Sequence, residues 1–329
     1  MSAKILVTGA NGHLGNNLVR SLLKSNTDVR ASVRNTNNKV PFEGLDCELV
    51  YADILDFDSL IKAMDSIDLV YHTAAVFKHW ANDPIDEIVK PNVEGTINLY
   101  KAAHQCGVKK IIYTSSIVTL DYGQVPLSPE SWNSNYTNPY NHSKTEAEKT
   151  AWKLSKELEI DTVAVLPSAI IGPNSFGHLT PTMGMLKSIL ENQMAFDINF
   201  TLNYIDVADV AAGMIAAATK GKPGQRYILG NKSPVNTSKL FEFANSLFPE
   251  VKIPPVIAKE QLMEFAINAL ENSKETGTSP ALLPYIVESS YDADVRLDIS
   301  KSEIDLGFNS SSAEESILKA FDYLKYREA

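Results

Sequence analysis

The chain has 329 residues, of which 44% are hydrophobic and 21% are charged, as in ordinary globular proteins. This length allows one large α/β domain with an appended lobe, or two domains. The formal net charge of −10 argues against a nucleic-acid-binding surface, which needs a basic face. The two cysteines, Cys47 and Cys106, have no metal-ligating neighbours, so we expect neither a disulfide framework nor a metal site. We find no membrane-spanning stretch and no signal-peptide pattern, and we therefore expect a cytoplasmic protein.

The stretch KILVTGANGHLG, residues 4–15, is the most informative part of the sequence. Its apolar start predicts a buried strand, and the apolar residues that follow the glycines recur at helical spacing. A strand, a glycine turn and a helix start direct free backbone N–H groups and the positive helix end toward one point, which forms an anion site. The alternative is a turn that uses glycine for its geometry alone. We expect a dinucleotide phosphate to be bound by Gly9, Asn11, Gly12, His13, Leu14 and Gly15.

The three glycines follow a threonine with the spacing G-x-x-G-x-x-G, which differs from the common G-x-G-x-x-G fingerprint. This pattern at the start of a chain resembles the extended short-chain dehydrogenase/reductase family. The resemblance implies a dinucleotide-binding domain, and the rest of the sequence can be compared with it.

The choice of cofactor is made at the end of the second predicted strand, residues 28–33. An acidic side chain at this place binds the ribose 2′-hydroxyl of NAD, whereas an arginine accommodates the 2′-phosphate of NADP. Arg34 stands there instead of an acid, with Arg30 behind it and Lys39 nearby. A planar guanidinium suits phosphate because it can form two parallel hydrogen bonds. We therefore expect NADP(H), contacted by Arg34 and Lys39, and the alternative is a solvated surface arginine.

The third predicted strand, residues 47–51, is followed by Asp53 and Ile54, which we interpret as cofactor contacts. The family resemblance implies that Asp53 lies beside the adenine amino group. It could also cap the helix that begins near residue 56, since aspartate is a favoured N-cap.

The fourth predicted strand, residues 68–72, leads into Ala74 and Ala75. Small residues at this place let a flat cofactor lie against the backbone, although tight packing of a loop explains them equally well. The aromatic segment 77–80 either walls a substrate pocket or forms a separate hydrophobic cluster. In the helix that follows, we interpret Asn92 as the N-cap.

The fifth predicted strand, residues 109–116, ends in two serines, and a helix begins with Tyr140 about two dozen residues later. Tyr140 and Lys144 are four residues apart and therefore share one helix face. A tyrosine hydroxyl has a pKa of about 10, and a nearby ammonium lowers that pKa and favours proton exchange. Ser116 can hold a substrate oxygen in place, with Ser115 as the second choice. The Tyr-x-x-x-Lys pattern is common by chance, so its significance comes from this context.

A sixth strand is predicted at residues 161–166, and the turn PSAIIGP follows it. The family resemblance implies that this turn passes beside the nicotinamide, with Pro167 and Ile170 as cofactor contacts. The alternation of strands and helices then stops until a strand at residues 225–229, and the remainder is mostly helical.

We therefore predict an α/β fold, namely a Rossmann-type doubly wound parallel sheet with a smaller, mostly helical C-terminal substrate lobe. The NADP-binding domain is expected at residues 1–175 and 203–232, and the lobe at residues 176–202 and 233–329. The active site should lie in the cleft between the two.

Several motifs look most like the dihydroflavonol reductase and cinnamoyl-CoA reductase branch of the family, which is part of the NAD-dependent epimerase/dehydratase superfamily. They are VRASVRN, YTSS, YNHSK, LPSAIIGP and RLDISKSEIDLGF. This resemblance implies that NADPH reduces an aldehyde or ketone to an alcohol. It further implies that Tyr140 donates the proton, that Lys144 binds the nicotinamide ribose and lowers the tyrosine pKa, and that Ser116 holds the carbonyl.

The main alternative is a nucleotide-sugar epimerase or dehydratase. Dehydratases of the family carry an acid pair after the serine or threonine of strand five, where this chain has Ile117 and Val118. Sugar epimerases usually have Phe-Asn after strand six, where this chain has Pro167 and Ser168. A steroid-dehydrogenase-like enzyme is a third option, and a non-catalytic NADP sensor is a remote one. We expect a small-molecule carbonyl substrate and a monomer or homodimer, with no nucleic-acid or membrane partner.

Overall fold

The computed structural model describes residues 4–176 and 179–327. Residues 1–3, 177–178 and 328–329, which the predicted domain ranges include, therefore lie outside the described part. Its centre is a sheet of seven strands in the order β10-β6-β5-β4-β1-β2-β3, and all neighbouring strands are parallel. The strands are β1 (Ile5–Thr8), β2 (Val29–Val33), β3 (Glu48–Tyr51), β4 (Leu69–His72), β5 (Lys110–Thr114), β6 (Asp161–Pro167) and β10 (Arg226–Leu229). The prediction of a Rossmann-type doubly wound sheet is confirmed.

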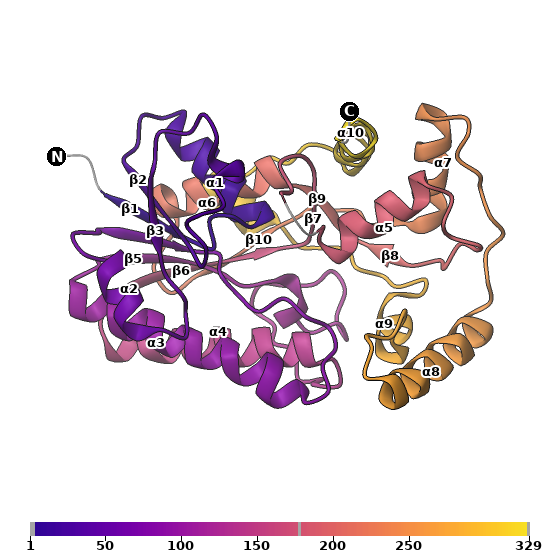
Figure 1. Cartoon of the computed structure of the whole chain (residues 1–329), viewed down its shortest axis with the longest axis horizontal. Helices are drawn as coiled ribbons and strands as arrows, with labels where there is room; N and C mark the ends of the chain where they lie inside the picture. Colours follow the sequence, from indigo (N-terminus) through magenta and orange to yellow (C-terminus); the bar gives the residue numbers. More distant parts are fainter. Residues whose placement is uncertain (1–3, 177–178, 328–329) are drawn as a thin grey trace.

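Helices cover both faces of this sheet, as Figure 1 shows. One face carries α1 (His13–Leu23) and α6 (Val207–Lys220), and the other carries α2 (Phe57–Ala63), α3 (Lys90–Cys106) and α4 (Pro139–Glu157). Strands buried on both sides read as continuous apolar runs, and β1, ILVT, is buried at every position.

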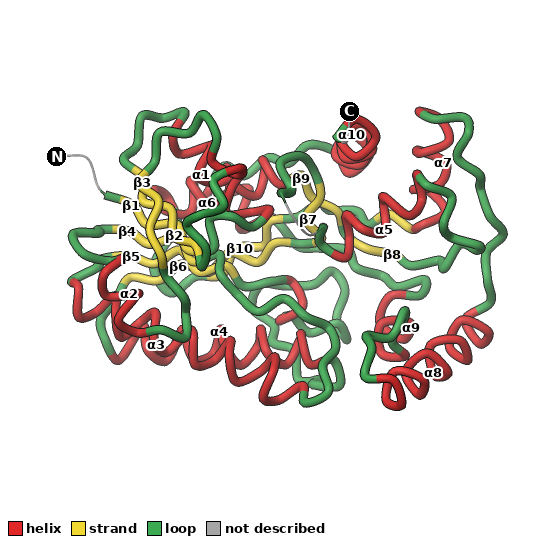
Figure 2. The backbone as a smooth tube through the Cα atoms, viewed as in Figure 1, coloured by secondary structure: helices red, strands yellow, loops and turns green. Residues whose placement is uncertain are grey.

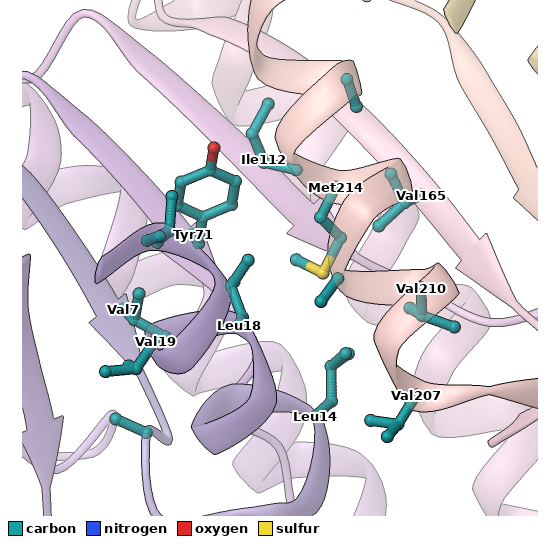
Figure 3. Close-up of a cluster of buried hydrophobic side chains, with 14 of the residues drawn as sticks. Val7, Leu14, Leu18, Val19, Tyr71, Ile112, Val165, Val207, Val210 and Met214 are labelled. Carbon is teal, nitrogen blue, oxygen red and sulfur yellow. The ribbon is translucent and has the colours of Figure 1, made fainter. Parts of the chain in front are cut away.

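The core beneath α1 and α6 joins these helices to the middle of the sheet (Figure 3). The side chains that point into it come from α1, from α6 and from strands β1, β4, β5 and β6. They include Leu14, Leu18, Val19, Val207, Val210, Met214, Val7, Tyr71, Ile112 and Val165. Because this core packs against the helix that follows the glycine turn, it fixes the position of the helix N-terminus at the sheet edge.

The rest of the chain forms a smaller part beyond the carboxyl ends of the strands (Figure 2). Two short strand pairs lie there: β7 (Ala169–Ile171) with β9 (Tyr204–Asp206), parallel, and β8 (Thr201–Leu202) with β11 (Val235–Asn236), antiparallel. The α-helices are α5 (Pro181–Leu190), α7 (Thr237–Leu247), α8 (Lys259–Thr276), α9 (Pro284–Ser290) and α10 (Ala313–Tyr326). The domain boundaries themselves stay a prediction.

Four short helical turns complete the chain, namely η1 (Val40–Phe42), η2 (Ile85–Val89), η3 (Ile117–Thr119) and η4 (Ser302–Leu306). Within residues 4–176 and 179–327, no helix is both long and apolar enough to cross a bilayer.

Two capping predictions are wrong. Asn92 lies inside a continuous helix, because the π-helical turn η2 precedes α3 and starts the helix seven residues earlier. The Asn92 side chain instead accepts a hydrogen bond from Val76 N (2.7 Å) and donates to Ser143 Oγ (2.5 Å), which ties the loop after β4 to α4. The N-cap of α2 is Asp56, whose carboxylate accepts from Ser59 N, while Asp53 accepts from a nearby backbone N–H.

Candidate functional site

A cleft of about 1920 Å³ opens beyond the carboxyl ends of the parallel strands, and both the sheet and the smaller part of the chain line it. It contains the point between β1 and β4 where the strand order reverses, which is where ligands bind in open α/β sheets. Single-ligand pockets measure roughly 300–1,000 Å³, so this cleft has room for a dinucleotide and a second molecule.

The glycine turn forms one end of the cleft. Gly9 has a φ of +64°, and Gly12 precedes α1 without any side chain capping the helix N-terminus. A Cβ atom on Gly15 would lie 2.4 Å from the carbonyl oxygen of Gly9 and 2.8 Å from Thr73 Oγ1. A Cβ on Gly9 would lie 2.9 Å from the Cα of Ala74. The turn is therefore too compact for side chains, and it presents uncapped backbone N–H groups as a phosphate cradle does.

His13 joins this turn to the loop after β7. Its Nε2 lies 3.0 Å from the carbonyl oxygens of both Gly172 and Pro173, so Nε2 carries the ring proton and donates to them. Burial lowers the pKa of His13, and its Nδ1 is buried without a partner in the described residues. Leu14 lines the cleft and also packs into the core, and Asn11 is exposed at the cleft wall.

Arg34 directly follows β2, the strand that pairs with β1, is exposed and lines the cleft. It forms no ion pair within the described residues. Arg30 is not available to a ligand, because its guanidinium is buried and donates to Glu48 Oε2 at 2.8 Å and to two backbone carbonyls. Lys39 is exposed and lies outside the cleft lining, whereas Asp53 and Ile54 line the cleft.

The structure brings Tyr140, Lys144 and Ser116 together in the middle of the cleft. Asn138 caps α4 by accepting from Tyr140 N at 3.0 Å, and Tyr140 and Lys144 are 9% and 7% exposed. Lys144 Nζ donates to the carbonyl oxygen of Thr114 at 3.1 Å, which holds the ammonium at the end of β5. The Ser116 side chain is hydrogen-bonded to Tyr140, so the two hydroxyls lie side by side in the cleft.

The Ser115 side chain has a different hydrogen-bond partner. Its hydroxyl is buried and donates to the Glu148 carboxylate, away from Tyr140. Of the two serines, Ser116 is therefore the one whose side chain lies beside the tyrosine.

The pKa values differ from the sequence-based expectation. Burial raises the pKa of Tyr140, and the hydrogen bond with Ser116 only partly opposes this. Burial also lowers the pKa of Lys144 to about 8, while the Glu148 carboxylate acts in the opposite direction. Lys144 is not among the groups that shift the Tyr140 pKa, so the expected lowering by its ammonium is not seen, and Tyr140 is protonated at neutral pH.

An aromatic wall flanks the tyrosine. The ring centroids of Phe77 and His79 each lie 4.9 Å from that of Tyr140, and Trp80 also lines the cleft. The segment 77–80 therefore belongs to the cleft and is not a separate hydrophobic cluster.

Further polar groups of the cleft escaped the sequence interpretation. Thr114 Oγ1 and Ser168 Oγ are buried, line the cleft and have no partner in the described residues, and Tyr122 interacts electrostatically with Tyr140. Thr114 and Ser168 sit at or just beyond strand ends, which is a signal that could have identified them. Ala74, Ala75, Pro167 and Ile170, which the sequence analysis interprets as cofactor contacts, also line the cleft. The compact glycine turn and these unpartnered hydroxyls fit a bound dinucleotide.

Comparison with known proteins agrees with this geometry. Residues 5–230 match the model of the NAD dependent epimerase/dehydratase family. A protein of Synechocystis named as a candidate dihydroflavonol 4-reductase is 35% identical over 241 residues, which are 71% of this chain and 69% of that protein. Sterol demethylase protein B of Methylococcus capsulatus is 29% identical over 332 residues, with 98% of both chains covered. The crystal structure of gox2253 has a TM-score of 0.84 at 29% identity, with 99% of both chains covered.

The glycine turn provides a first prediction. Gly15→Ala should weaken binding of a nicotinamide dinucleotide at least about tenfold, since the added Cβ, 2.4 Å from Gly9 O, forces the phosphate-binding turn apart. Gly184→Ala in α5 is the control, because a Cβ there meets nothing within 4 Å. Fluorescence titration gives the affinities, and thermal unfolding checks that both variants fold. Wild-type affinity of folded Gly15→Ala would rule the turn out as the phosphate site.

Proposed function

Because the chain belongs to the NAD dependent epimerase/dehydratase family, we propose that it catalyses the NADPH-dependent reduction of an aldehyde or ketone to an alcohol. Its relatives are named reductases and epimerases, and the chain is an NAD(P)-dependent oxidoreductase. Our proposal adds three finer points to this assignment. They are NADP as the cofactor, a carbonyl compound as the substrate and the roles of individual residues.

The observation that carries the proposal is the charge of the cleft lining. Among the described residues that line it, the lysines and arginines are Arg34, Lys78 and Lys144. Arg34 belongs to the glycine-turn end, Lys144 lies beside Tyr140, and Lys78 is exposed with its Nζ 3.7 Å from Glu87. Among the described lining residues, the only cation outside the cofactor end and the surroundings of Tyr140 is thus Lys78, which is paired with Glu87, and this is little positive charge for the diphosphate of a nucleotide sugar.

The wall contributed by the smaller part of the chain is instead mostly apolar. It includes Met185, Ile198, Phe200, Met263, Leu282 and Ile286. The charged residues on this wall, Glu288 and Asp294, are acidic and are already paired with Lys259 and Arg296, so they offer no positive charge to a diphosphate. An apolar lining of this kind suits a carbonyl compound with a hydrophobic body.

Bound NADPH would supply the hydride for the carbonyl carbon. In this proposal Tyr140, which keeps its proton at neutral pH, would donate it to the carbonyl oxygen as negative charge develops there. Ser116 would hold that oxygen by a hydrogen bond. Lys144 would bind the nicotinamide ribose, and its ammonium would stabilise the phenolate left on Tyr140.

A steroid-dehydrogenase-like activity is the second candidate. It is favoured by the match to sterol demethylase protein B, which covers 98% of both chains, and by the size of the cleft. A non-catalytic NADP sensor is disfavoured, since Tyr140 and Lys144 are both present and meet in the cleft.

The reaction class can be tested directly. Purified protein should oxidise NADPH when an aromatic or aliphatic aldehyde or ketone is added, and a sterol ketone tests the second candidate. Tyr140→Phe removes only the acidic hydroxyl, so turnover should fall about 10²-fold or more while NADPH binding persists. The matched control is Tyr136→Phe, which removes an exposed hydroxyl near the same helix. Epimerisation of a nucleotide sugar without net NADPH consumption would reverse the assignment.

The pKa of Lys144 predicts the alkaline limb of the pH profile. With a pKa of about 8, the ammonium is present below that pH and is lost above it. We therefore expect kcat/KM to fall above pH about 8, by up to tenfold per pH unit. Lys153→Met, which changes an exposed lysine on the same helix, should leave this limb in place. A profile that stays flat to pH about 9.5 would show that the Lys144 charge is not needed.

The preference for NADPH is predicted to reside in Arg34. A hydrogen bond to a charged group contributes about 1.5–3 kcal/mol, and solvent exposure favours the lower figure. The wild type should therefore bind NADPH roughly 10- to 100-fold more tightly than NADH. Arg34→Asp should reverse this order, because a carboxylate repels the 2′-phosphate and can accept from the free 2′-hydroxyl of NADH.

Titration of both cofactors against both proteins measures the effect. Lys39→Asp introduces the same change in charge outside the cleft lining and should alter the ratio of the two affinities much less. Equal affinity of the wild type for NADH and NADPH would show that Arg34 is an ordinary surface arginine.

A further inference from the structure

His79 holds an unusual place in the cleft. Its imidazole lies in the loop between β4 and α3, 4.9 Å from the Tyr140 ring and 5.4 Å from the Phe77 ring, measured between centroids. The hydroxyl of Tyr285, in α9, donates to the backbone carbonyl of His79 and holds this part of the loop. The histidine is therefore fixed beside the proposed proton donor.

Neither ring nitrogen of His79 has a partner in the described residues. Nδ1 is buried without a hydrogen bond, whereas Nε2 is not one of the buried unpartnered atoms, and His79 lines the cleft. Burial lowers the pKa of His79, so the ring is neutral at pH 7, with one N–H donor and one acceptor nitrogen. An enclosed acceptor without a partner is tolerated better than an enclosed N–H, so the proton belongs on Nε2.

The geometry points to a second substrate-recognition donor. We infer that the Nε2–H group of His79 donates a hydrogen bond to an acceptor oxygen one or two bonds from the carbonyl that Tyr140 protonates. This inference rests on the proposed function, and it names the substrate class as carbonyl compounds with a neighbouring oxygen, such as 1,2-diketones. Such a substrate pairs its second oxygen with the His79 N–H, whereas a simple ketone leaves that N–H unpaired.

A pair of ketones that differ by one oxygen tests this. The probes are 1-phenylpropane-1,2-dione and 1-phenylpropan-1-one. The readout is the kcat/KM value of the dione divided by that of the simple ketone. Because the intrinsic reactivity of each ketone is the same for every variant, a change in this ratio between variants reports recognition. His79→Phe keeps an aromatic ring beside Tyr140 and removes both nitrogens. We expect the ratio to fall about 10- to 100-fold, with the value for the simple ketone changed less than about threefold.

Two further variants separate recognition from packing. His79→Gln retains an N–H donor and should recover part of the ratio. Phe77→Leu alters the same wall without removing a polar group and should affect both ketones alike. A fall of equal size for both ketones in His79→Phe, or no change, would overturn the inference.

The proposed function can fail separately. If the wild type reduces neither ketone, the reductase assignment falls, and calorimetric titration of both ketones into the protein loaded with NADP⁺ then decides the role of His79. Tighter binding of the dione to the wild type than to His79→Phe, by about tenfold or more, supports recognition by His79. Equal binding to both proteins, or no binding of the dione to the wild type, overturns it.

Discussion

A buried ion pair between Glu148 and Arg226 holds together the elements from which the site is built. Glu148 Oε1 accepts from Arg226 Nε at 2.7 Å, and the two side chains are 0% and 7% exposed. The carboxylate also accepts from Ser115, and the guanidinium donates to Thr119 and to two backbone carbonyls of the loop that follows. A buried charge pair is tolerated only when its remaining hydrogen-bonding capacity is satisfied, and here it is. The helix of Tyr140 and Lys144, the end of β5 and the edge strand β10 are thereby fixed to one another.

Much of the fold followed from local patterns. The glycine turn, the parallel strands and the helix that carries Tyr140 each have a short sequence signature, because backbone conformation and hydrophobic periodicity are properties of neighbouring residues. The family resemblance read from these motifs agrees with the match over residues 5–230. The error at Asn92 has the same origin. An asparagine before an apolar helix is typical of an N-cap, but a π-helical turn upstream had already started the helix.

The features of the site that could not be predicted from the sequence depend on tertiary contacts. Arg30 lies within β2 and Arg34 directly follows it, and only the structure shows that Arg30 is paired with Glu48 while Arg34 lines the cleft. The raised pKa of Tyr140 arises from burial, which no spacing of residues reveals. The same is true of His79, whose significance comes from a missing hydrogen-bond partner and from the distance to a ring that lies 61 positions away in the chain.

The hydrogen bond from the Tyr285 hydroxyl to the main-chain carbonyl of His79 joins residues that are 206 positions apart in the chain. Every amino acid has that carbonyl, so the bond does not depend on which side chain occupies position 79. The wall of the cleft can consequently accumulate substitutions at this position while the loop stays anchored to α9. A protein built in this way can change the compounds it accepts during evolution without rebuilding the scaffold that carries Tyr140 and Lys144.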